Sequence, residues 1–356
     1  MNKHFTAFLL IFVCMYTSAA QKLPVRITVD TKSREHVQGM AIDTVARAFY
    51  LSFTSSFVKT DYQGNVLASI DSINGHLGAM TFDYARRRVY ASLECKDDEI
   101  GRSISQHLGA EQYSQENSRF YIAEIDVDKL SGRNTPAALA MNTYEVGEAI
   151  RDYKNRYGCS GIDGVTIAPQ IGKKNGKPCL YVAYGIYGDI SRRDNDHQIL
   201  LEYKFSSLKP GAKEPKPAAK YFIYTGNTTW GIQNLAYDAN TGCIFMAAYS
   251  GKKPEFPNFS LFAVPVNQKP ENKILRGLEN DGKYLSLSLL QQGLLSSVKG
   301  VRGWRFGKAT TGMCPLGDGR WYFSTPEKHR KWQTATVEMF RWKGGPGENP
   351  FEPAEP

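Results

Sequence analysis

The sequence predicts an all-β protein with the fold of a β-propeller, most simply one of five blades. Three observations favour this fold. A unit of two short strands joined by a tight turn recurs along the chain, a third strand-like run follows each copy, and an unpaired strand-like segment precedes the first copy. One small sheet cannot bury both of its faces without neighbours, so repeated sheets of this kind indicate a closed ring of blades.

The clearest copy of the unit is His76–Leu93, with the sequence HLGAMTFDYARRRVYASL. Two runs rich in apolar, β-branched and aromatic residues flank a polar, basic turn, which is the pattern of a β-hairpin. Four further copies can be recognised, at His36–Phe53, Gly161–Tyr184, Trp230–Tyr249 and Thr310–Ser324.

Each copy is followed by a run that we interpret as a third strand: Phe57–Asp61, Arg119–Val127, Gln198–Phe205, Ser260–Val266 and Thr336–Trp342. Outer strands are expected for the first four blades at Val66–Ile70, near Met141, at Lys220–Thr225 and at Tyr284–Leu290. The last blade lacks one, and Val25–Val29 can supply it, because closing a blade with the N-terminal strand removes an open sheet edge. A sixth blade remains an alternative if Gly293–Lys308 hides a degenerate copy.

The repeated pattern of Gly, Ala and Asp before the turn and Tyr after it resembles the NHL and YWTD-like group of propellers. The resemblance covers five short windows and implies the fold only. Copies three and five depart from it, with Ala168 and Leu316 where the pattern has Asp. No catalytic residue is carried over from this group.

The N-terminus predicts export. Lys3, the apolar stretch Phe5–Met15 and the small residues up to Ala20 match a secretory signal peptide with cleavage after Ala20, so we expect a secreted or periplasmic protein. The expected organisation is a signal peptide at 1–20, one propeller domain at 21–345 and a flexible Pro/Glu tail at 346–356. No later apolar run reaches the roughly 18 residues of a membrane-spanning helix.

Composition limits the partners. The net charge of +9 falls to +8 when the signal peptide, which contains Lys3, is removed, and this favours anionic ligands. Nucleic acid is not expected, since the sequence has no basic helix and no recognised binding motif. Five of the 6 cysteines lie after Ala20, an odd number that cannot pair completely within one chain, and none forms a CxxC zinc pair.

Loop lengths predict which face of the propeller binds a ligand. Turns between the first and second strands are short, whereas most loops between the second and third strands are long: Glu94–Ser118, Gly185–Asp196, Ser250–Asn258 and Pro326–Thr334. We call the face that carries these loops, together with the segments leading into the inner strands, the long-loop face. Long loops in a compact domain are commonly functional, so this face is the expected binding surface.

His36 and His76 occupy equivalent positions at the start of adjacent blades, each seven residues before the blade Asp. Both are expected near the mouth of the central channel on the long-loop face. They are candidate catalytic residues, as a general base and its partner, and candidate ligands of a divalent metal. The alternative is that each imidazole only hydrogen-bonds to the loop beside it.

Other polar and aromatic residues at this level have the composition of a sugar-binding pocket, in which rings stack and hydroxyls take directed hydrogen bonds. The candidate ligand-binding residues are Asp163, Trp230, Gln233, Asn234, Thr311, Arg192 and Arg193. Polar side chains that merely fill a wet channel are the alternative. Two acidic loop segments, Glu94–Glu99 and Asp189–His197, offer oxygen ligands for Ca²⁺ but lack the spacing of an EF-hand.

These features favour an exported propeller that binds an acidic glycan or oligosaccharide and processes it by lyase or hydrolase chemistry. One alternative is a propeller that binds a glycan or a protein on its long-loop face without catalysis. A second is a calcium-dependent nucleotide or ester hydrolase. The sequence has no G-x-S-x-G, H-E-x-x-H or P-loop motif, and it does not decide whether the protein is an enzyme.

Overall fold

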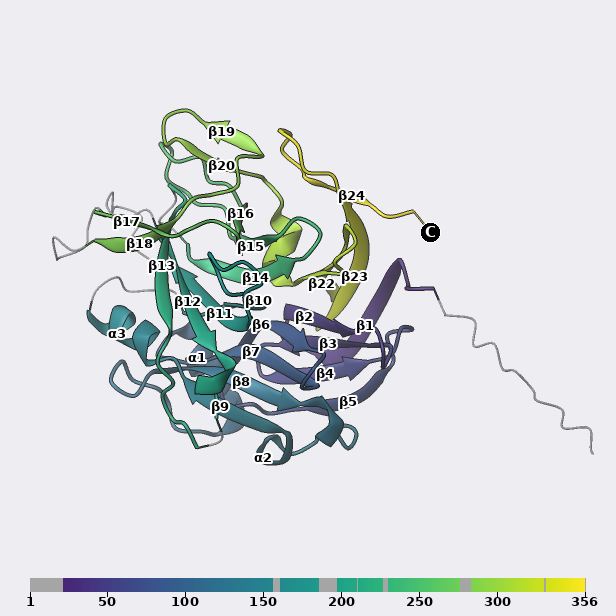
Figure 1. Cartoon of the computed structure of the whole chain (residues 1–356). Helices are drawn as coiled ribbons and strands as arrows, with labels where there is room; N and C mark the ends of the chain where they lie inside the picture. Colours follow the sequence, from purple (N-terminus) through teal and green to yellow (C-terminus); the bar gives the residue numbers. More distant parts are fainter. Residues whose placement is uncertain are drawn as a thin grey trace, which may run out of the picture.

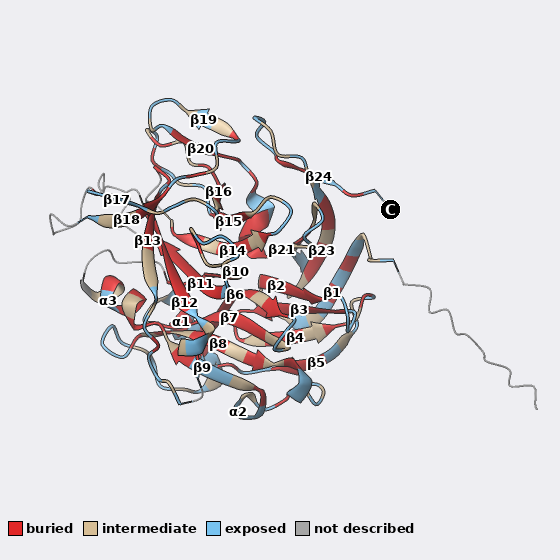
Figure 2. Ribbon diagram, in the orientation of Figure 1, coloured by how far each residue is buried: buried red, intermediate tan, exposed pale blue. Residues whose placement is uncertain are grey.

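The computed structural model describes residues 22–155, 161–185, 197–209, 211–226, 230–275, 283–329 and 331–355. They form five sheets arranged as blades around a central axis, so the predicted five-bladed propeller is confirmed (Figure 1). Buried residues follow the strands, and the loops at the periphery are mostly exposed (Figure 2). Within these ranges no helix is both long enough and apolar enough to cross a membrane.

The first three blades contain the strands that the repeats predict. The first blade is β2 (Val37–Asp43), β3 (Ala48–Phe53), β4 (Ser56–Thr60) and β5 (Val66–Ile70). The second is β6 (His76–Asp83), β7 (Arg88–Cys95), β8 (Arg119–Asp126) and β9 (Met141–Glu145), and the third is β10 (Gly164–Pro169), β11 (Pro178–Gly185), β12 (His197–Lys204) and β13 (Ala219–Tyr224). Helices lie between strands, namely α1 (Glu99–Leu108), α2 (Ala137–Ala140) and α3 (Gly147–Asn155).

The fourth blade differs from the prediction. It contains β14 (Ile232–Asp238), β15 (Cys243–Ala248) and β16 (Leu261–Pro265), but the outer strand expected at Tyr284–Leu290 belongs elsewhere. There β18 (Tyr284–Leu287) pairs in parallel with β13 of the third blade, and β17 (Glu271–Lys273) lies beside it. The outer place next to β16 is taken by Trp304, which bridges to Leu261 and is buried.

The segment Gly293–Lys308 therefore does not hide a sixth blade. It contains a short hairpin of β19 (Leu294–Ser296) and β20 (Val301–Gly303), which leads into Trp304. The Trp304 ring lies 5.4 Å from the Trp342 ring and 6.5 Å from the Phe245 ring, measured between centroids. This burial of a large aromatic side chain explains why a single residue can replace an outer strand.

The fifth blade is closed as expected. Its strands are β21 (Met313–Pro315), β22 (Arg320–His329) and β23 (Trp332–Trp342), and β1 (Arg26–Ser33) pairs antiparallel with β23. The loop predicted at Pro326–Thr334 is mostly an extension of β22 and β23. The segment after Gly345 is more than a tail, because β24 (Phe351–Pro353) also pairs with β23 and Phe351 is buried against Trp321 and Phe323.

The repeated Gly and Asp both have structural roles. A Cβ on Gly39 would lie 2.6 Å from the Gly78 carbonyl oxygen, so glycine lets neighbouring inner strands approach each other. Asp43 accepts hydrogen bonds from the Val45 and Ala46 amides in the following turn, at 3.0 and 2.9 Å. Asx-type turns of this kind explain why Asp recurs before the tight turn in the first, second and fourth copies of the unit.

We expect Gly39→Ala to lower the free energy of unfolding by about 1–3 kcal/mol, because backbone atoms of the next blade must move to admit a methyl group. Chemical denaturation measures the change. Gly307→Ala is the matched control, since no atom lies within 4 Å of a Cβ placed there. Equal stability of the two variants would contradict the close approach of the inner strands.

Candidate functional site

Three ionisable side chains meet near the propeller axis, at the long-loop ends of the inner strands. His76 begins β6, Glu94 lies near the end of β7, and Asp163 directly precedes β10 of the next blade. One potential ligand atom of each lies within 4.8 Å of the other two, and all three residues are buried. We call this group, together with Lys96, the channel cluster.

Strand register and close backbone packing bring these residues together. His76 and Glu94 are direct partners across β6 and β7. The Ala79 amide donates to the Asp163 carbonyl at 3.2 Å, which joins β6 to the segment before β10. A Cβ on Gly78 would lie 3.1 Å from Asp163 Oδ1, so the absence of a side chain there leaves room for the carboxyl group.

Glu94 is held on two sides. Its Oε1 accepts a hydrogen bond of 2.5 Å from the Ile162 amide, and its Oε2 lies 2.8 Å from the Lys96 ammonium group. Lys96 also lies 3.3 Å from Asp98 Oδ2. Gly161 has φ +137°, and a Cβ there would lie 1.7 Å from Glu94 Oε1, so only glycine fits against this carboxylate.

The protonation preferences of the two carboxyl groups are opposite. Burial favours the neutral form of Glu94, but Lys96 and His76 outweigh it and hold the pKa of Glu94 well below its usual range. Burial, followed by the negative charge of Glu94, raises the pKa of Asp163 well above that of an ordinary carboxyl. Asp163 is therefore suited to exchange a proton near neutral pH, whereas Glu94 stays ionised.

The two predicted histidines lie in different environments. Burial opposes a charge on His76, but Glu94 and Asp163 outweigh it and raise the pKa of His76. His36 is half-buried, and burial together with the nearby His76 lowers the pKa of His36. Its Nε2 lies 2.9 Å from the Gln38 side-chain nitrogen. The two imidazoles are close enough to interact electrostatically, but only His76 belongs to the channel cluster.

The channel cluster also provides a possible metal site. In the part of the chain that the structure describes, His76, Glu94 and Asp163 are the only group of three or more such donors, and His36 is not among them. Nitrogen and carboxylate donors suit several divalent cations. However, a metal bound to Glu94 Oε2 would have to replace the Lys96 ammonium group, which already supplies positive charge there.

Several predicted ligand-binding side chains hydrogen-bond to the backbone instead. Asn234 is buried and donates to the carbonyl oxygens of Gln38 and Thr310, at 3.0 Å each. It thereby joins the inner ends of three blades. Thr311 donates to the Ser324 carbonyl at 2.7 Å, and Gln233 donates to the Gly231 carbonyl at 3.5 Å. These bonds are consistent with a structural role for all three.

Aromatic side chains lie at the rim. Trp230 is half-buried, and Lys252 Nζ lies 5.7 Å from its ring centroid. Tyr249 is 40% exposed, and burial of its hydroxyl together with the negative charge of Asp163 raises the pKa of Tyr249. Arg192 and Arg193 lie outside the described residues.

Sequence reasoning missed Glu94 and Lys96 as site residues, because the acidic segment Glu94–Glu99 reads as a solvated loop. Glu94 is instead the buried end of β7, in the strand sequence RVYASLEC. The available signal was alternation. Tyr90, Ser92 and Glu94 share one face of the strand, so alternation alone places Glu94 on the same side as a core tyrosine.

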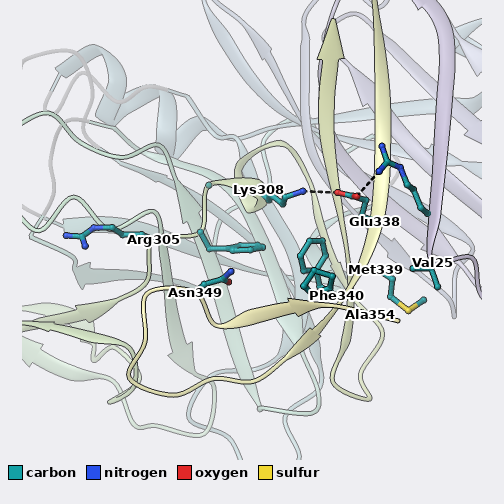
Figure 3. A pocket seen from close by; sticks show the side chains of 12 residues that line it. Val25, Arg305, Lys308, Glu338, Met339, Phe340, Asn349 and Ala354 are labelled. Atoms are coloured by element: carbon teal, nitrogen blue, oxygen red, sulfur yellow. Dashed lines mark hydrogen bonds and ion pairs between the residues drawn. The ribbon is translucent and has the colours of Figure 1, made fainter. Parts of the chain in front are cut away.

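Two further cavities lie away from the channel cluster. One of about 600 Å³ lies against the outer part of the fifth blade, where Lys308 reaches Glu338 at 2.8 Å (Figure 3). Because Arg26 also lies 3.3 Å from Glu338, this carboxylate is neutralised by its own neighbours. Another, of about 340 Å³, lies at the opposite end of the inner strands and is lined by apolar residues such as Met80, Leu235 and Met313.

Comparison with protein-family models and with curated proteins finds no match, so the NHL and YWTD-like resemblance gains no support. Among solved structures, the chain is similar to a GH43 β-1,3-galactosidase with galactodeoxynojirimycin, at 12% identity over 88% of this chain and 94% of that chain, with a TM-score of 0.43. It is similar to the GH43_1 enzyme from Xanthomonas citri complexed with xylose, at 9% identity over 89% and 91%, with a TM-score of 0.41.

A protein of unknown function from Desulfotomaculum acetoxidans is similar at 11% identity over 86% of this chain, with a TM-score of 0.37. The chain spans 65% of the length of that protein. Likenesses at this level identify no function for the chain.

Proposed function

We propose that this protein is an exported propeller that binds an acidic glycan at the long-loop end of its channel and cleaves it, with Asp163 as the acid-base residue. The observation that carries the proposal is the buried group of His76, Glu94 and Asp163, whose donor atoms lie within 4.8 Å of one another next to the Lys96 ammonium group. In this group burial and neighbouring charges raise the pKa of Asp163 and lower that of Glu94. Neighbouring titratable groups whose pKa values are shifted in opposite directions are typical of acid-base sites.

The charges of the channel cluster favour elimination over hydrolysis. In β-elimination from a uronic acid, a base removes the proton at C5, the bond between C4 and the glycosidic oxygen breaks, and that oxygen takes up a proton. A positive charge beside the substrate carboxylate stabilises the carbanion-like transition state. Asp163 can serve as the base, and the imidazolium of His76 and the ammonium of Lys96 are the nearby positive charges.

Hydrolysis commonly uses a second carboxylate that is free to attack or to activate water. Glu94 does not meet this need, because its side chain is fully buried and bound to Lys96 and the Ile162 amide. This difference supports a lyase over a hydrolase within the proposed class.

The direct test is incubation of the purified protein with uronate-containing polysaccharides and neutral ones. A lyase produces unsaturated ends that absorb near 235 nm, whereas a hydrolase produces reducing ends without that absorbance. The Asp163→Asn variant, purified identically, is the blank for contaminating enzymes. We expect absorbance from at least one uronate polymer, and activity that survives a chelator. Activity lost with the chelator would instead show that a divalent metal takes part in the cleavage, and no product from any substrate would refute cleavage.

Binding without catalysis is the second candidate, and the aromatic rim around Trp230 favours it. We expect Trp230→Ala to weaken glycan binding by about 1–3 kcal/mol, because a ring that stacks on a sugar face is lost. Glycan-array binding followed by titration calorimetry measures the effect. Tyr84→Ala is the control, since Tyr84 is 49% exposed at a turn on the opposite face. Equal affinity of wild type and Trp230→Ala would remove Trp230 from the binding site.

A further inference from the structure

A hollow on the long-loop face lies over the first blade. It is a groove of about 730 Å³, lined by the turn between β3 and β4, by α1 of the second blade, and by Trp332 at the start of β23. Lys32 at the end of β1 and Arg34 and Glu35 in the segment between β1 and β2 complete it. Residues from three blades thus form one groove over the first blade.

The inner end of the groove adjoins the channel mouth. Glu35 lines the groove and directly precedes His36, whose ring is close enough to His76 for their charges to interact. Glu35 is fixed in place, because its carboxylate accepts hydrogen bonds from the Ser55 amide at 2.8 Å and from the Ser55 hydroxyl at 2.7 Å. The groove is therefore placed to continue a chain that enters the channel mouth.

Cationic side chains that line the groove outnumber the acidic ones, with Lys32, Arg34 and Arg133 against Glu35 and Asp71. Its acidic side chains, Glu35 and Asp71, are engaged by the hydroxyls of Ser55 and Ser69. Arg34 and Arg133 line the groove and are exposed, and among the described residues neither is paired with a carboxylate. Exposed guanidinium groups without a protein partner are suited to bind carboxylate or sulfate in a bidentate manner.

The groove also offers an aromatic ring. Trp332 is half-buried in its wall, and Lys331 Nζ lies 4.9 Å from the ring centroid. A tryptophan face can stack on a sugar ring while neighbouring cations bind the acidic substituents. Cations, hydroxyls and one aromatic ring in a single hollow match the chemistry of an acidic oligosaccharide.

We propose that this groove binds the extended part of an anionic oligosaccharide outside the channel cluster. Arg34 and Arg133 bind its carboxylate or sulfate groups, and Trp332 stacks on one sugar ring. The inference rests on the proposed function and deepens it, because it assigns negatively charged sugars as the class that the site selects.

The test is titration calorimetry at low salt with three probes: an octamer of polygalacturonate, a heparin octasaccharide and a neutral cello-oligosaccharide. We expect the Arg34→Ala/Arg133→Ala double variant to bind an anionic probe about tenfold more weakly than wild type, and the neutral probe to bind weakly to both. The difference should shrink in 0.5 M NaCl, since salt screens exposed charges. Equal or tighter binding of polygalacturonate shows that carboxylates are sufficient, whereas binding of the heparin octasaccharide alone shows that sulfate is required.

Lys173→Ala/Lys174→Ala is the matched control, because both lysines are exposed in the turn between β10 and β11 on the opposite face. It removes the same charge and should bind within about twofold of wild type. Equal affinity of the two double variants for the anionic probes would contradict the proposed binding groove. The proposal would also fail if the wild type bound the neutral probe as tightly as the anionic ones.

The outcomes separate the two proposals. If the wild type binds through Arg34 and Arg133 but yields no product, the proposed binding groove is supported and the proposed cleavage is refuted. If the wild type cleaves a uronate octamer and the Arg34→Ala/Arg133→Ala variant cleaves it with the same KM, cleavage stands and the groove fails.

Discussion

Replacing Asp163 by asparagine is expected to lower kcat/KM for an acidic glycan by about 10²–10⁴-fold, the usual contribution of a general acid or base. Asparagine keeps the size of the side chain but cannot transfer the proton. Initial rates on the preferred uronate polymer measure the loss. Asp97→Asn is the matched control, because Asp97 is a partly exposed carboxylate that pairs with Arg102 outside the channel cluster. Wild-type rates in Asp163→Asn would exclude Asp163 from the chemistry.

The same variant should change stability in a defined direction. An unfolded Asp has a pKa near 3.9, and folding raises the pKa of Asp163 above this value. At a pH between the unfolded and the folded pKa, the folded protein keeps a proton on Asp163 that the unfolded chain has released. This contribution to stability therefore falls as pH rises through that window. Asp163→Asn lacks the effect, and its stability relative to wild type should increase over the same window. Unfolding curves from pH 4 to pH 8 measure it, and a constant difference would contradict the raised pKa.

Glu94→Gln is expected to lower the free energy of unfolding by about 3–5 kcal/mol, because Lys96 would remain almost fully buried without its closest carboxylate. In a chain of this size that corresponds to a fall in Tm of several degrees. Glu116→Gln, at an exposed position, is the control. Adding Lys96→Met to Glu94→Gln should recover part of the loss, since it removes the ammonium group that has lost its closest carboxylate.

The effect of Glu94 should depend on pH in the opposite sense to that of Asp163. Folding lowers the pKa of Glu94, so its stabilisation is present above the unfolded value near 4.3 and is lost as pH falls toward the folded pKa. The difference between wild type and Glu94→Gln should therefore narrow below about pH 4. A difference that stays the same at low pH would show that the Glu94–Lys96 pair is not its source.

The repeat predicted the propeller because most of the residues that recur have the same structural role in each blade that carries them. Gly39 leaves room for the neighbouring inner strand, and Asp43 accepts the hydrogen bonds of the turn. The strand at Val25–Val29 covers the free edge of β23 in the last blade. The outer strands carry less information. The prediction for Tyr284–Leu290 was wrong, because Trp304 occupies the outer position of the fourth blade and is held there by burial of its indole. A single buried residue of this kind cannot be recognised from a run of β-forming residues.

The site was predictable only in part. His76 and Asp163 were found because they begin successive repeats, and position alone distinguishes them. Glu94 and Lys96 were missed because their role depends on burial and on a contact with another blade, where the Ile162 amide donates to Glu94. Contacts between blades cannot be recognised from local sequence. Asn234 was predicted to bind a ligand, and the structure adds that its side chain donates to two backbone carbonyls of other blades, which local sequence does not show.

The pairing of β1 with β23 also bears on how the chain reaches its folded state. Arg26 is the partner of Glu338, so the ring closes only when two segments separated by nearly the whole chain meet, which makes this a slow, late step. Until then β1 has both edges free. Its alternating pattern places Arg26, Thr28, Asp30 and Lys32 on the less buried face. Charges on such a strand hinder its pairing with a strand of another molecule, so they oppose aggregation until the fifth blade has formed.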